Sequence, residues 1–126
     1  MGGTEVSELW PADFRVAVED VFGGKGLNRT AYDIVNRRVE HAFGVWGQRF
    51  EMNPKQHEYA WAVLRSAVLQ VKANQARIQP RNPYPYWRRA VAASMERVVN
   101  NEDAHAGFKR RAGLVDVAAQ LEEAFA

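Results

Sequence analysis

The residues with the clearest chemical pattern in this sequence are the aromatic and arginine side chains between Arg77 and Val91, RIQPRNPYPYWRRAV. Rings and guanidinium groups alternate there beside closely spaced prolines. This combination of residues binds single-stranded nucleic acid in other proteins, because bases stack on the rings at about 1–3 kcal/mol each and arginines contact the phosphates. The residues predicted to make these contacts are Arg81, Tyr84, Tyr86, Arg88 and Arg89.

A second basic cluster follows about one helix later, at Lys109, Arg110 and Arg111. If the two helices are antiparallel neighbours, both clusters share one face and both contact the same ligand. A solvated face, on which these side chains contact only water, explains the second cluster equally well. The sequence leaves both interpretations open.

The aromatic residues also have a purely structural interpretation. Trp87 lies in helical register with Val91, so we expect its ring in the core. Tyr84 or Tyr86 could pack over the start of the helix instead of contacting a ligand. The sequence therefore offers stacking and packing as alternatives for the two tyrosines.

No group of residues has the spacing of a catalytic or metal site. His57-Glu58 begins like the zinc-binding HExxH motif, but Trp61 stands where the second histidine is needed. The glycine-rich run at 23–26 lacks the spacing of a phosphate-binding P-loop and follows a predicted helix, not a strand. We therefore expect no catalytic residue, no metal and no cofactor, and we predict that the protein is not an enzyme.

Length and composition indicate one helical domain over residues 1–126. This length is sufficient for a hydrophobic core, and 47% hydrophobic with 25% charged residues is a globular composition. The absence of cysteine excludes disulfides and thiolate metal ligands. The N-terminus lacks the apolar stretch of a signal peptide, and no apolar run approaches the roughly 20 residues of a membrane helix. We expect a cytoplasmic protein with no membrane partner.

Charge is unevenly distributed along the chain, although the net charge is only +2. Residues 1–20 carry a net −4, residues 72–111 a net +6 and the last fifteen residues a net −3. Arginine outnumbers lysine 13 to 4, and arginine suits planar, bidentate contact with phosphate or carboxylate. High genomic GC content would also produce this ratio.

Arg88 and Arg89 occupy consecutive helix positions next to a buried tryptophan, so both must point at least partly outward.

The elements that position these residues are predicted to be helices, because apolar residues recur every three or four positions. The predicted segments are 11–22, 31–50, 54–79, 83–100 and 108–125. No period-two alternation typical of a strand is present. The fold class is therefore all-α, a single-domain bundle of about five helices, with residues 1–10 expected to be disordered or derived from a tag.

Local signals mark where these helices begin and end. Asn53-Pro54 and Asn82-Pro83 each combine an N-cap residue with proline at the first helical position. Asn28 or Thr30 is the expected cap of the second helix. Gly44 and Gly47 weaken the second half of that helix, which favours a kink or an early end there.

A helix-turn-helix is an alternative interpretation of the first half of the chain. Its first helix would be Pro11–Phe22 and its second would begin at Thr30, so that Arg29, Arg37 and Arg38 face DNA. The connection is longer than the usual three- or four-residue turn. Two antiparallel helices of a bundle explain the pattern as well.

The run from Arg77 to Val91 resembles the NP-x-x-Y helix start of helical domains in plasmid and phage replication initiators and primosome-loading proteins. The matching residues are Asn82, Pro83 and Tyr86, with Arg88 and Arg89 where such domains carry basic residues. Pro85 and Trp87 depart from the pattern, and the winged helix that usually accompanies these domains is not recognisable. The resemblance implies a role in the replication of a mobile element.

The sequence thus predicts a non-enzymatic, all-α module that binds DNA or RNA, either as a plasmid or phage replication accessory or as a small subunit of a nucleoprotein complex. The alternative is a protein–protein adapter or inhibitor whose arginine, tyrosine and tryptophan side chains contact an acidic partner. The sequence leaves open the oligomeric state, the type of nucleic acid and whether the chain is a whole protein or one domain.

Overall fold

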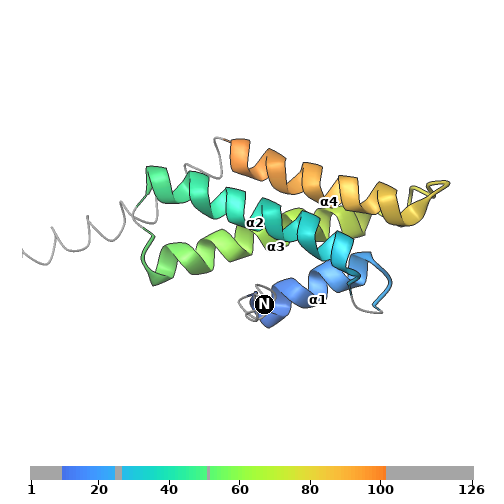
Figure 1. The fold of residues 1–126 in the computed structure, drawn as a ribbon, viewed down its shortest axis with the longest axis horizontal. Helices are drawn as coiled ribbons and strands as arrows, with labels where there is room; N and C mark the ends of the chain where they lie inside the picture. The colour runs from blue at the N-terminus through green and yellow to red at the C-terminus, as the bar shows by residue number, and fades with distance from the viewer. Residues whose placement is uncertain (1–9, 25–26, 51, 102–126) are drawn as a thin grey trace, which may run out of the picture.

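The computed structural model describes residues 10–24, 27–50 and 52–101, and these contain four α-helices and no strand. The helices are α1 (Ala12–Val21), α2 (Arg29–Arg49), α3 (Pro54–Asn74) and α4 (Pro83–Asn100). Consecutive helices run in opposite directions along the bundle (Figure 1). The all-α class is confirmed. The fifth predicted helix, at 108–125, falls outside the described residues, so the bundle seen here has four helices.

Three of the predicted helix boundaries follow from local hydrogen bonds and backbone angles. The side-chain oxygen of Asn28 accepts a hydrogen bond from the backbone N–H of Ala31 at 2.9 Å, and Asn53 accepts one from Gln56 at 3.1 Å. Each bond satisfies a backbone donor that the first turn of a helix leaves unpaired. Gly23 and Gly24 end the first helical region with φ angles of +89° and +73°, which favour glycine.

Three local expectations differ from the structure. The third helix, predicted over 54–79, ends at Asn74. The second helix does not end early, because α2 continues through Gly44 and Gly47 to Arg49. An added Cβ would meet nothing within 4 Å at either glycine, so no close packing requires glycine there. Asn82 precedes α4 as predicted, but its side chain makes no capping hydrogen bond.

The core joins all four helices. α1 packs against α3, α3 against α4, and α4 against α2. Phe14, Trp46, Leu64 and Met95 are fully buried, one from each helix. Trp87 is 7% exposed, so its predicted core position is confirmed.

Buried polar groups tie these helices together. The Ser94 hydroxyl on α4 donates to the carbonyl oxygen of Ala67 on α3 at 2.8 Å. The indole N–H of Trp10 donates to the side-chain oxygen of Asn36 on α2 at 3.1 Å. Trp10 is only 4% exposed and belongs to the core. Trp10 is therefore ordered, contrary to the expectation that residues 1–10 are disordered or derived from a tag, and residues 1–9 fall outside the described residues.

The helix-turn-helix alternative gains no support from the packing of α1. Its principal neighbour is α3, and two side chains near the end of α3 hold its C-terminus: Lys72 and Gln75 donate to the carbonyl oxygens of Asp20 and Val21, at 3.1 and 2.8 Å. These donors satisfy carbonyls that the end of a helix leaves unpaired. Among the described residues, no helix has both the length and the apolar character needed to cross a membrane.

Candidate nucleic-acid interface

The predicted site lies at the bend between α3 and α4 and on the first half of α4. Residues 75–82 connect the two helices without helical structure. The prolines predict this only for residues 79–82, whereas residues 75–78 are predicted to continue the third helix. Arg81 lies on this bend, is exposed, and makes no hydrogen bond or ion pair with another described residue. Its guanidinium is therefore available to an anionic ligand.

Tyr84 is half-buried at the end of the bundle, and its ring packs against other residues of the fold. Its ring centroid lies 5.1 Å from that of Phe22, just beyond α1. Its hydroxyl oxygen accepts a hydrogen bond from the backbone N–H of Asn28 at 3.4 Å. The guanidinium carbon of Arg88 lies 5.7 Å from the Tyr84 ring centroid, a cation–π contact. The packing alternative, not the stacking one, therefore describes Tyr84 in this structure.

Arg88 is only partly available. It is half-buried against Tyr84, and its Nε atom is buried without a hydrogen-bond partner among the described residues. A guanidinium has five donors, so its terminal nitrogens can still reach an anion at the surface. The expectation that Arg88 and Arg89 both point at least partly outward agrees with their exposure, but they are not equivalent.

Arg89 and Tyr86 are exposed, as a contact with a ligand requires. The Nε of Arg89 donates to the carbonyl oxygen of Pro85 at 3.4 Å, which leaves its terminal nitrogens outside that bond. Tyr86 is 39% exposed and meets Trp87 at an interplanar angle of 88°, with ring centroids 4.9 Å apart. Because the rings are perpendicular, Trp87 does not stack on Tyr86.

Helix α2 adds cations beside α4 that the predicted site did not include. Arg38 forms an ion pair with Glu96 of α4, and His41 lies 3.7 Å from the other oxygen of the same carboxylate. Arg37 lies one helical turn before His41, is exposed, and has no hydrogen bond or ion pair with a described residue. The sequence indicates a ligand contact for Arg37 only within the helix-turn-helix alternative, because nothing local indicates that α2 packs beside α4.

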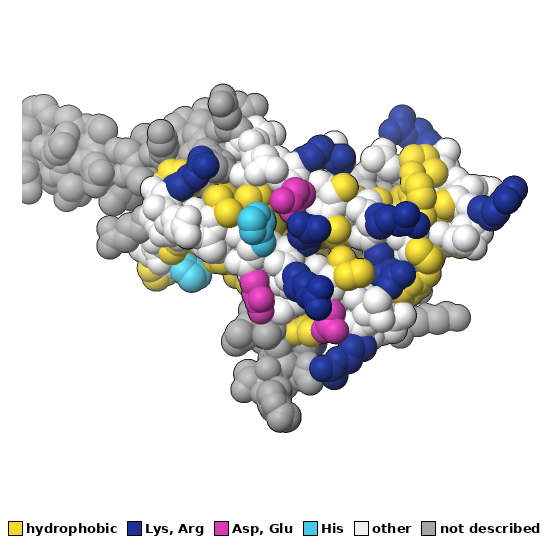
Figure 2. All heavy atoms as spheres, turned by 45° about the horizontal axis from the view of Figure 1, so that its top comes forward, with side chains coloured by type: hydrophobic (Ala, Val, Ile, Leu, Met, Phe, Trp, Pro, Cys, Tyr) yellow, Lys and Arg dark blue, Asp and Glu magenta, His cyan; other side chains and the backbone are white. Residues whose placement is uncertain are grey.

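Arginine dominates this side of the molecule. From residue 75 to residue 101 there is one acidic side chain, Glu96, and the basic ones are Arg77, Arg81, Arg88, Arg89 and Arg97. Figure 2 shows the side of the bundle that carries α2 and α4, with Lys and Arg side chains spread over it and few acidic ones between them. We call the basic side chains that α2, α4 and the bend carry here, namely Arg37, Arg81, Arg88, Arg89 and Arg97, the arginine face. Arg88 and Arg97 lie nine residues apart on α4 and leave it on opposite sides, so the arginine face extends around this helix. Its predicted extension, Lys109, Arg110 and Arg111, lies outside the described residues.

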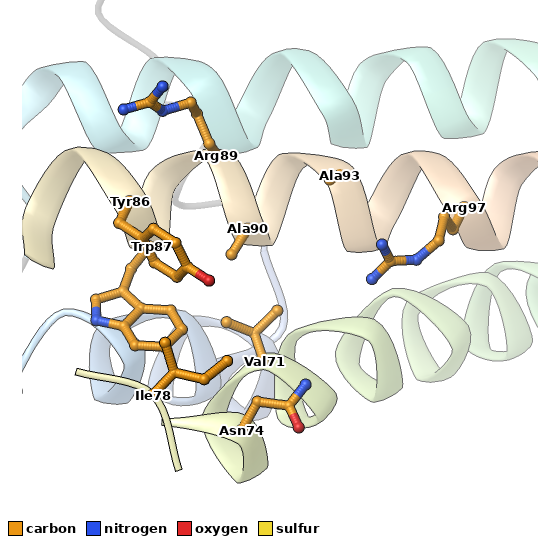
Figure 3. A pocket seen from close by; sticks show the side chains of 9 residues that line it. All are labelled: Val71, Asn74, Ile78, Tyr86, Trp87, Arg89, Ala90, Ala93 and Arg97. Atoms are coloured by element: carbon orange, nitrogen blue, oxygen red, sulfur yellow. The ribbon is translucent and has the colours of Figure 1, made fainter. Parts of the chain in front are cut away.

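A groove of about 480 Å³ opens beside the arginine face, between α4 and the end of α3. Its floor is formed by Val71, Ile78, Trp87 and Ala90. Figure 3 shows the Tyr86 ring directed toward this floor and the guanidinium of Arg97 turned along the groove toward it, whereas Arg89 points away from it. This volume lies within the range of sites that bind small molecules.

Metal binding and known relatives give no further indication of function. Among the described residues, no group of three histidine or acidic side chains could hold a metal ion. No protein-family model matches the chain, and neither a curated protein nor a solved structure matches it. The arginine face and the groove beside it are therefore the features of this molecule that indicate a function.

Proposed function

We propose that the protein is a non-enzymatic helical module that binds nucleic acid through the arginine face. The observation that carries this proposal is the excess, on neighbouring helices and the bend, of exposed guanidinium groups that have no acidic partner in the described part of the chain. Arg37, Arg81 and Arg97 have no hydrogen bond or ion pair within the described residues, and Arg89 bonds only to a carbonyl oxygen. Guanidinium groups bind phosphates bidentately, and a nucleic acid offers phosphates in series.

The predicted residues have different roles in this proposal. Arg81, Arg88 and Arg89 contact phosphates, with Arg37 and Arg97 added from the surface geometry. Tyr86 is the ring that contacts a base, whereas Tyr84 supports the position of Arg88. A role as a replication accessory of a plasmid or phage is compatible with this surface, and it rests on the NP-x-x-Y resemblance at Asn82, Pro83 and Tyr86.

A protein–protein adapter is the second candidate, and one observation favours it. Ile78 is 40% exposed and Tyr86 is 39% exposed, on either side of Trp87. Aromatic, aliphatic and arginine side chains in one patch are typical of the centre of a protein interface. An acidic partner with an apolar anchor would fit this patch.

Charge reversal on the arginine face tests the proposal. The variant carries Arg89→Glu and Arg97→Glu, two exposed positions on α4. Each change removes a charged hydrogen bond and adds a repulsive carboxylate, so we expect about a tenfold or greater loss of affinity per position. The measurement is fluorescence anisotropy with labelled single- and double-stranded DNA and RNA at about physiological salt.

A control variant tests whether the loss of affinity comes from the arginine face or from the changed net charge of the whole protein. Lys55→Glu alters an exposed residue with no partner among the described residues, at the start of α3 and thus at the end of the bundle opposite the bend. We expect it to retain most of the affinity. If the wild-type protein raises the anisotropy of none of the labelled oligonucleotides, the proposal is wrong and the adapter becomes the leading candidate.

A further inference from the structure

The groove between α3 and α4 combines an apolar floor, an exposed ring and cations at its edge. Val71, Ile78 and Ala90 provide the apolar surface, and Trp87 contributes an edge that is almost fully buried. A flat, aromatic ligand fits this lining better than a purely charged one, because the floor offers no charged partner. Neither guanidinium lies on this floor: that of Arg97 turns along the groove, and that of Arg89 points away from it (Figure 3).

Asn74 adds a hydrogen-bond donor with a defined orientation. The Nη2 of Arg77 donates to its side-chain oxygen at 2.7 Å. A guanidinium cannot accept a hydrogen bond, so the atom facing Arg77 must be the amide oxygen. The amide nitrogen is therefore on the other side, and Figure 3 shows it directed toward the groove. A ligand in the groove would meet this donor with an acceptor atom, such as a base carbonyl.

Two arginines that line the groove would contact the phosphate backbone of a nucleic acid. Arg89 and Arg97 lie eight residues apart on α4, about two helical turns, and both line the groove. The Arg97 guanidinium turns toward the floor, whereas that of Arg89 points outward (Figure 3). Phosphates bound by these two guanidinium groups would lie on either side of the part of the ligand that occupies the groove.

We propose that the groove receives an unpaired nucleobase, with the adjoining phosphates on Arg89 and Arg97. The inference rests on the proposed function and specifies its substrate as single-stranded nucleic acid. A duplex keeps its bases stacked and paired, so it can contact the arginine face but cannot fill the groove. The Tyr86 ring stacks on the inserted base, and the Asn74 amide donates to it.

The test compares three ligands of equal length: an oligothymidylate, the same backbone without bases, and a blunt duplex. The abasic strand keeps the phosphates and loses only the groups that enter the groove. Because each stacked base contributes substantially to affinity, we expect the oligothymidylate to bind about tenfold more tightly than the abasic strand. Trp87 lines the groove, so its fluorescence should change with the oligothymidylate alone.

A matched pair of variants locates the effect. Ala93→Leu fills the groove at an exposed lining position of α4, and Ala73→Leu makes the same change at an exposed position of α3 that does not line it. Neither changes charge. We expect Ala93→Leu to remove the preference for the oligothymidylate while leaving the abasic strand bound as before, and Ala73→Leu to leave both unchanged.

The possible failures are distinguishable. If all three ligands bind with equal affinity, the inference is wrong and the proposed function stands. If Ala93→Leu retains the full preference, the bases bind elsewhere and the inference is wrong. If no ligand binds at low salt, the proposed function fails with it, and the same groove would then fit an acidic peptide with an aromatic anchor.

Discussion

At the scale of single residues, Tyr84 and Tyr86 show how two similar side chains take different roles within half a helical turn. Tyr84 contacts Phe22, Asn28 and Arg88, so its ring is part of the fold. Tyr86 faces the groove and keeps 39% of its surface exposed. The burial of each ring determines what its loss does to stability.

Alanine substitution should therefore separate the two tyrosines. We expect Tyr84→Ala to lower the free energy of unfolding by about 2 kcal/mol, somewhat less than for a fully buried aromatic residue, because its ring is half-buried. Tyr86→Ala should cost less than about 1 kcal/mol. Urea unfolding followed by far-ultraviolet circular dichroism measures both, and equal losses would contradict the assignment of Tyr84 to the fold.

At the scale of elements, the two Asn-Pro starts are identical in sequence and different in structure. The Asn53 side chain accepts a hydrogen bond from the Gln56 N–H, with Asn53 at φ −79° and ψ 173°. Asn82 has φ −117° and ψ 90° and makes no such bond. The proline-rich bend before α4 fixes the backbone that precedes Asn82, which gives a different approach to the helix.

The stability of capping variants should reflect this difference. We expect Asn53→Ala to lower the free energy of unfolding by about 1 kcal/mol, because a first-turn donor loses its partner. Asn82→Ala should cost no more than a few tenths of a kcal/mol, since no capping bond is lost. Urea titrations of the two variants and the wild-type protein measure the difference, and a larger loss at Asn82 would be inconsistent with the structure.

At the scale of the whole molecule, the arginine face exists because α2 and α4 pack side by side. The ion pair between Arg38 and Glu96, with His41 on the same carboxylate, joins the two helices. It also neutralises the single acidic side chain between residues 75 and 101. The cations without an ion pair among the described residues then come from both helices, Arg37 from α2 and Arg89 and Arg97 from α4.

The salt dependence of binding should show that the face spans both helices. Removal of one phosphate contact lowers the slope of log affinity against log salt by about 0.7 for a single strand. We expect Arg37→Gln and Arg89→Gln each to produce about this change, and the double variant about twice as much. Lys55→Gln serves as the control with an unchanged slope. No change for Arg37→Gln would confine the interface to α4 and the bend.

The sequence by itself determined most of the helical framework. The three- and four-residue apolar spacing, the residues Asn28 and Asn53, and the glycines after α1 act through neighbours a few positions away. Everything that these local signals depend on lies within a short stretch of the sequence. The all-α class, most of the helix boundaries and the core position of Trp87 could therefore be predicted. The end of α3 could not, because the helix stops at Asn74, five residues before the predicted end at 79. The number of helices could not be confirmed, because the fifth segment falls outside the described residues.

Only the tertiary structure decided which of the predicted site residues are available. Tyr84 already contacts two residues more than fifty positions earlier in the chain: its ring packs on Phe22 and its hydroxyl oxygen accepts a hydrogen bond from Asn28. Arg37 joins the site because α2 lies beside α4, and the groove exists because α3 ends beside Trp87. Side-chain exposure depends on contacts between segments distant in the chain, and helical periodicity carries no information about those partners.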